Sequence, residues 1–97
     1  MVKVKFSPST NKEKKYMAVF YSDSGEKIKT TQFGYNLGSN YIDHKDDKKK
    51  DAWIARHSVR GTFNDYKSAS GLSRWILWNK KTLRESISDY KRRFNLK

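Results

Sequence analysis

The clearest helical pattern of apolar and polar positions lies near the carboxyl end of the chain. Four apolar residues there fall at i, i+4, i+7 and i+11, on one face of an α-helix: Leu83, Ile87, Tyr90 and Phe94. Thr82 and Glu85 have the spacing of a capping box, in which the hydroxyl accepts from the Glu85 amide and the carboxylate reaches back. Three cations, Lys91 to Arg93, lie where the carbonyl end of a helix favours positive charge.

A short, strongly apolar segment precedes this helix. Leu72, Trp75 and Ile76 form an i, i+3, i+4 set, and the next two residues, Leu77 and Trp78, widen the apolar arc. We expect the segment to be a second helix in the core, joined through residues 79–81 to the last helix. The prediction is that these side chains are buried together: Trp75, Ile76, Trp78, Leu83, Ile87, Tyr90 and Phe94.

The first third of the chain has the pattern of β-strands. Apolar residues alternate with lysines over 2–6 until Ser7-Pro8-Ser9, and two runs rich in aromatic and β-branched residues, 15–21 and 27–33, flank a Ser-Asp-Ser-Gly turn. These features predict a three-stranded antiparallel sheet. Because both alternating sets of 15–21 are apolar, we expect that strand to be central, with both faces partly covered.

The middle of the chain contains one more helix. Glycines at 34 and 38 end the strand pattern, and acids at 43, 46 and 47 favour a helix start before Lys48–His57, which would dock through Trp53 and Ile54 with His57 on the same face. A connection over 58–70 carries Phe63 and Tyr66 as anchors. The fold class is therefore α+β: one domain, 1–97, with a sheet part (1–34) and a helical part (41–97) of about three helices.

Composition narrows the choice of protein class. The chain has 97 residues and no cysteine, which excludes a disulfide framework and a cysteine-bound zinc. Because aromatics make up 14% of residues within a hydrophobic total of 35%, a few large rings must supply most of the core. Neither an 18-residue apolar run nor a signal-peptide pattern is present, so we expect a soluble protein without a membrane partner.

The net charge points to a polyanionic partner. The chain has 22 Lys and Arg against 10 Asp and Glu, a formal charge of +12. A field of this strength is typical of proteins that bind nucleic acid, although it also arises from a merely soluble surface.

Catalytic chemistry has no convincing set of residues. The histidines at 44 and 57 stand near Asp43, Asp46 and Asp47, but the lysines between these acids oppose cation binding, and helix capping explains the acids as well. No histidine pairs with an acid and a nucleophile, and FGYNLGS lacks the ending of a phosphate loop. We expect no enzyme, no metal, no cofactor and no small-molecule substrate.

Binding residues are easier to nominate. Lysine and arginine suit phosphate contacts, which position a protein without reading sequence. The candidates are the bases that the predicted elements leave exposed: Lys12, Lys14, Lys45, Lys48, Lys49, Arg56, Arg84, Lys91 and Arg92. Dipole complementation and solvated helix faces are the alternatives for these charges, and the three tryptophans fit core packing better than stacking platforms for single strands.

A resemblance adds a biological setting. Five blocks of the sequence carry it: Phe33-Gly34, 41–46 (YIDHKD), 53–57 (WIARH), 70–80 (SGLSRWILWNK) and 86–94 (SISDYKRRF). Together they resemble an uncharacterised family of small basic proteins encoded by giant and other large double-stranded DNA viruses. The blocks span about two-thirds of the chain, from residue 33 to 94. One departure is Lys81, where that family commonly has proline. The resemblance implies a virion protein, found in host cytoplasm or nucleus during infection, and brings no catalytic residues.

Two function classes follow. The first is a non-enzymatic virion protein that binds nucleic acid, double-stranded DNA above all, through phosphates without sequence specificity. The second is a minor capsid or internal scaffold protein that contacts other virion proteins.

Overall fold

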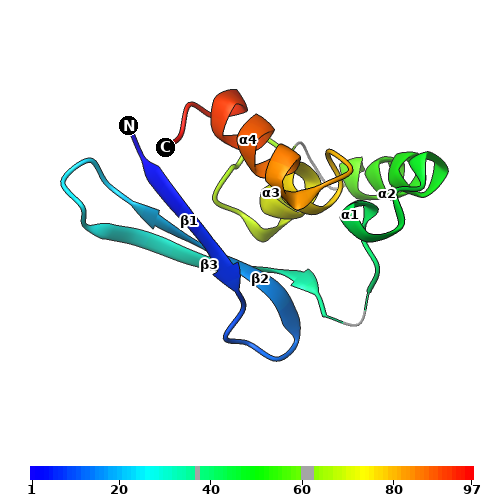
Figure 1. Ribbon diagram of the computed structural model, residues 1–97, viewed down its shortest axis with the longest axis horizontal. Coiled ribbons are helices and arrows are strands. Elements are labelled where there is room, and N and C mark those ends of the chain that lie inside the picture. Colours follow the sequence, from blue (N-terminus) through cyan, green and yellow to red (C-terminus); the bar gives the residue numbers. More distant parts are fainter. Residues whose placement is uncertain (37, 60–62) are drawn as a thin grey trace.

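The α+β prediction is confirmed: an antiparallel sheet is followed by helices (Figure 1). The computed structural model describes residues 1–36, 38–59 and 63–97. The elements, in chain order, are β1 (Lys3–Pro8), β2 (Lys14–Tyr21), β3 (Lys27–Tyr35), α1 (Tyr41–His44), α2 (Asp47–Ser58), α3 (Ala69–Leu72), the π-helix η1 (Ser73–Leu77) and α4 (Leu83–Arg93).

The sheet has the order β1-β2-β3, so β2 is central as expected. Its register places Val4 opposite Phe20, Phe6 opposite Ala18 and Tyr16 opposite Phe33, and this set of side chains faces the helices. In Figure 1, α3 and α4 lie over this face, and α1 and α2 lie beyond the end of β3. The other alternating set of β2, which includes Met17 and Val19, is only half-buried and has no helix over it.

Residues from the sheet and the helices form one core. Val4, Ala18, Phe20 and Phe33 from the strands pack with Tyr41, Leu72, Ile76, Leu77, Trp78, Tyr90 and Leu96. Tyr90 is fully buried, and its hydroxyl donates to the Tyr66 carbonyl at 2.7 Å. Since Phe63 likewise accepts from the Trp75 indole at 2.9 Å, both aromatic residues of the long connection act as the expected anchors, through their carbonyls.

The apolar segment is wound differently from the prediction. Over Ser73–Leu77 the chain forms a π-helix, and the Trp78 amide donates to the Ser73 carbonyl five residues back, at 3.0 Å. The wider turn brings Leu77 inside with Leu72 and Ile76 and leaves Trp75 at the boundary. The expectation that all seven apolar residues are buried together is therefore wrong for four of them, which are partly buried against the core: Trp75, Leu83, Ile87 and Phe94.

A helical turn that the pattern did not predict, α1, links the sheet to α2. Lys45 ends it in the left-handed conformation, with φ of 57°. The Tyr41 hydroxyl donates to Asp47 at 2.6 Å, and this hydrogen bond, together with burial, raises the pKa of Tyr41 to about 12. Gly34, with φ of +83°, lets β3 approach η1, because a Cβ there would lie 2.8 Å from Leu77 Cδ1.

Candidate nucleic-acid interface

The acids ahead of α2 serve as helix caps. Asp46 is the N-cap, and its carboxylate accepts from the amides of Lys48 and Lys49 at 3.0 and 3.3 Å. Asp43 accepts from the Asn40 amide and from Lys15 Nζ, both at 2.9 Å. Burial alone would raise the pKa of Asp43, but these hydrogen bonds outweigh it and lower that pKa.

The nominated basic residues fall into three groups. The first group, on α1 and α2, is exposed and consists of Lys45, Lys48, Lys49 and Arg56. The second group lies at the β1–β2 turn, where Lys12 is exposed and Lys14 half-buried. The third group, on α4, consists of Arg84, Lys91 and Arg92, of which Lys91 is half-buried. The three groups belong to separate elements of the fold.

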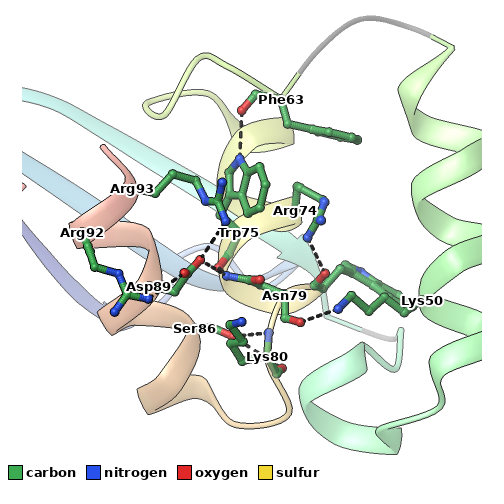
Figure 2. A network of polar contacts seen from close by, with 11 residues as sticks. Lys50, Phe63, Arg74, Trp75, Asn79, Lys80, Ser86, Asp89, Arg92 and Arg93 are labelled. Carbon is green, nitrogen blue, oxygen red and sulfur yellow. Dashed lines mark hydrogen bonds and ion pairs between the residues drawn. The ribbon is translucent and has the colours of Figure 1, made fainter. Parts of the chain in front are cut away.

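A set of cations absent from the nominated residues connects α2 to α4. We define it as the cation cluster: Lys50 of α2, Arg74 of η1, Lys80 of the following turn and Arg93 of α4 (Figure 2). Lys50 Nζ donates to the Asn79 carbonyl at 2.7 Å, and Arg74 Nη1 donates to the Trp78 carbonyl at 2.8 Å. These carbonyls follow the end of η1, where unpaired acceptors attract cations.

Trp75 organises two members of the cluster. The guanidinium carbons of Arg74 and Arg93 lie 4.1 and 3.9 Å from the centre of its ring. Figure 2 shows the two arginines on either side of the indole. Cation–π attraction therefore fixes two guanidinium groups at one place on the surface.

One buried carboxylate, Asp89, balances part of this charge. It accepts from Asn79 Nδ2 at 2.7 Å, Arg92 at 3.1 Å and Arg93 at 3.4 Å. Burial opposes ionisation of Asp89, but the hydrogen bonds from Asn79 and Arg92 and the charges of Arg93 and Lys80 lower its pKa. Asp47 and Asp51 also act on Lys50, so three carboxylates lie near the four cations of the cluster and Arg92, and the region keeps a positive balance.

The cations of the cluster repel one another. The pKa of Lys50 is lowered, first by burial and then by the charges of Arg74 and Lys80. The pKa of Arg74 is lowered in the same way, by burial and then by Arg93. Because like charges are held close together in a partly desolvated place, an anion that binds between them relieves the repulsion. The arrangement is chemically suited to a phosphate group.

Sequence reasoning nominated none of the four members of this cluster. Lys50 shares a helix face with Trp53, and this pattern indicates that the face docks on the core. It gave no reason to nominate Lys50 as a phosphate-binding residue. Arg93 fitted dipole complementation, and Arg74 stands inside an apolar segment. The available signal was the alternation of Arg and Lys with tryptophan over 74–80, although nothing in it shows that α2 places Lys50 beside Asn79.

The tryptophans have different environments. Trp78 is buried, with 7% of its surface exposed, which confirms its core role. Trp53 is half-buried; it packs against the core and stacks on Trp78 with ring centres 5.1 Å apart. His57 is exposed, contrary to the expected core position, because it lies in the last turn of α2 with its ring stacked on the outer part of Trp53 at 4.1 Å.

The histidines do not converge on a metal. His44 Nδ1 accepts from the Asp46 amide at 3.0 Å, and its ring lies 5.3 Å from that of Trp78. Within residues 1–36, 38–59 and 63–97, no three His, Cys, Asp or Glu side chains are grouped as metal ligands. In the same ranges, no helix has the length and apolarity needed to cross a bilayer.

Comparison with known proteins gives one match. No curated protein and no solved structure matches the chain. A family profile matches residues 4–57, which run from β1 to the last turn of α2 and include Lys50 but not the rest of the cation cluster. Because the match covers more than half of the 97 residues, the chain belongs to DUF5754, a family of unknown function.

Proposed function

We propose that this protein is a non-enzymatic nucleic-acid-binding protein that contacts phosphates and does not read base sequence. The observation that carries the proposal is the cation cluster, in which four bases from four parts of the fold come together beside the buried carboxylate of Asp89 and the Asn79 that binds it. Phosphate contacts from lysine and arginine supply the sequence-independent part of nucleic-acid affinity.

The position of the cluster also supports this function. It connects α2 and α4, and both helices carry further exposed bases: Lys48, Lys49, Arg56, Arg84 and Arg92. A nucleic-acid backbone that binds the cluster therefore lies near further cations on both sides. The formal charge of +12 draws any polyanion toward this surface.

The proposed setting is a virus particle, and it rests on the resemblance in segments 41–46, 53–57, 70–80 and 86–94. Inside a particle filled with double-stranded DNA, a strongly basic protein is surrounded by phosphate. We place the protein in the virion, and in the host cytoplasm or nucleus during infection.

A second function is favoured by an apolar hollow beside β1. The hollow has a volume of about 320 Å³ and is lined by Phe6, Ser7, Pro8, Tyr16, Ile76, Leu83 and Ile87. An apolar hollow with half-buried walls can receive an apolar side chain of another protein. A minor capsid or internal scaffold protein would use it against another virion protein.

Binding to a duplex over a range of salt concentrations tests the proposed function. For phosphate binding, log K falls linearly with log salt, with a slope of about −0.9 for each phosphate contacted. Lys80→Gln removes an exposed member of the cluster and should weaken binding and make the slope shallower by about one. Lys27→Gln, at the exposed start of β3, is the matched control and should leave the slope unchanged.

Two further results would separate the proposed functions. Absence of binding at low salt contradicts the nucleic-acid function and favours the scaffold function. Locating the protein in purified virions then separates the two settings, because a nucleic-acid-binding protein is expected with the genome and a scaffold protein with the shell.

A further inference from the structure

A cavity of about 280 Å³ lies between α2, η1 and the paired ends of β2 and β3. We call it the α2 cavity. Its wall combines aromatic rings with a few polar side chains: Lys14, Phe33, Gly34, Tyr35, Asn40, Trp53, His57, Ala69, Ser70, Ser73, Leu77 and Trp78. This mixture of flat apolar surface and few polar groups is typical of ligand sites, and the volume suits a small flat group.

The aromatic part of the wall is a stack of parallel rings. Trp53 and Trp78 are 9° from parallel with centres 5.1 Å apart, and His57 lies 20° from parallel with Trp53 at 4.1 Å. Phe63 is also nearly parallel to Trp53, at 5.9 Å. Such a stack extends readily by one more planar ring, because offset stacking is favourable for each added face.

The polar part of the wall can satisfy a heteroaromatic ring. Asn40 is 7% exposed, and its Nδ2 has no hydrogen-bond partner among the described residues. A ring carbonyl or ring nitrogen bound in the cavity would offer this nitrogen an acceptor. Lys14, at the β2 end of the cavity, supplies a cation for the phosphate attached to such a ring.

We propose that the α2 cavity accepts one unpaired nucleobase. The inference rests on the proposed function and narrows the partner to nucleic acid with at least one base outside a duplex. A base inside a duplex is stacked on both faces and hydrogen-bonded along its edge, so it cannot enter the cavity without being extruded. An unpaired base enters at no such cost, and the cation cluster holds the backbone.

Three DNA probes of equal length test this inference: a single strand, the same single strand with abasic sites throughout, and the corresponding duplex. The abasic strand keeps every phosphate but has no ring to insert. Since stacking on an aromatic side chain contributes roughly 1–3 kcal/mol per base, the normal single strand should bind about 5- to 150-fold more tightly than the abasic strand. Base insertion should also change tryptophan fluorescence, because Trp53 lines the cavity.

A variant that fills the cavity supplies the second measurement. Ser70 is exposed, belongs to α3 and lines the α2 cavity. Ser70→Phe should remove the preference for the normal strand over the abasic strand and leave the salt dependence unchanged. Ser88→Phe introduces the same ring at an exposed position of α4 and should keep the preference.

The outcomes separate the two proposals. Equal, salt-dependent binding of normal and abasic strands overturns the base site and leaves phosphate binding intact. A preference that survives Ser70→Phe also overturns the assignment to this cavity. Absence of binding by all three probes at low salt overturns both proposals.

Discussion

Asp89 is the residue on which the cation cluster depends. Its two carboxylate oxygens hold Asn79, Arg92 and Arg93, and Asn79 in turn positions the carbonyl that Lys50 binds. A buried carboxylate with charged hydrogen-bond partners is costly to remove, because each partner then loses its acceptor. Asp89 therefore couples the stability of the fold to the shape of the proposed interface.

Asp89→Asn should lower the free energy of unfolding by about 1–3 kcal/mol at neutral pH, the usual range for a lost charged hydrogen bond. The pKa of Asp89 in the folded state lies below its unfolded value, so ionised Asp89 stabilises the fold above the unfolded pKa of about 3.9. This contribution is lost as the pH falls through the folded pKa. Urea unfolding should therefore show a difference between variant and parent that shrinks below about pH 4.

Glu26→Gln is the control, because Glu26 is an exposed carboxylate in the β2–β3 turn. The free energy of unfolding of this variant should match that of the parent both at pH 7 and below pH 4. An Asp89→Asn variant as stable as the parent at pH 7 would contradict the role given to this carboxylate.

Single residues were predicted with mixed success. Ile76, Trp78 and Tyr90 lie in the core as expected, because burying their large apolar side chains is favourable. Trp75 and Lys50 could not be placed from the sequence. Their environments depend on contacts between elements far apart in the chain, and a local period carries no information about those contacts.

At the scale of elements, α4 begins directly after its N-cap residue, Thr82. The Thr82 hydroxyl accepts from the Glu85 amide at 3.1 Å, as the capping pattern predicts. The return contact differs from the expected one, because the Glu85 carboxylate accepts from the Thr82 hydroxyl, at 2.9 Å. The start of α4 thus depends on a single hydroxyl with two partners.

Thr82→Ala should destabilise the protein by about 0.5–2 kcal/mol, the range for loss of an N-cap side chain. Thr82→Ser keeps the hydroxyl and should restore most of this loss. Thermal unfolding of both variants measures the effect. Equal losses in Ala and Ser variants would show that the methyl group of Thr82, and not its cap, matters.

Strands and caps were predictable because their signals are local. The strands were expected at 2–6, 15–21 and 27–33 and are found at 3–8, 14–21 and 27–35, since alternation and turn residues determine them. The π-helix was not predictable, because Leu72, Trp75 and Ile76 also match an α-helical period. Contact of η1 with α4, α3 and β3 selects the wider turn.

At the scale of the whole molecule, positive charge is distributed over several surfaces. The nominated groups on α2 and α4 are separate, and the cation cluster lies between these helices. The sequence indicated a basic protein correctly, but it could not show which cations converge, because the docking of α2 on η1 determines that. The family match stops at residue 57 and adds no information about α4.

Loss of charge should accordingly weaken binding in steps. Lys48→Gln with Lys49→Gln, or Lys91→Gln with Arg92→Gln, should each make the salt slope shallower by roughly one to two units for every DNA sequence alike. Because the pairs lie on different helices, the four changes together should add. Titrations over a range of salt concentrations measure the slopes, and unfolding curves check that Arg92→Gln leaves the fold intact. A single pair that abolishes binding would contradict a distributed surface.

The outer edge of β1 is closed by a residue from the opposite end of the chain. The Val4 amide donates to the Lys97 carbonyl at 3.0 Å, and the Lys97 amide donates to the Val2 carbonyl at 2.9 Å, so the two ends meet in Figure 1. Val4 and Lys97 are more than ninety residues apart in the sequence, so this part of the edge is covered only after the intervening chain has been made. An uncovered strand edge invites pairing with another chain. A chain that lacks Lys97 or has not yet docked it therefore exposes this part of β1 to pairing with another chain.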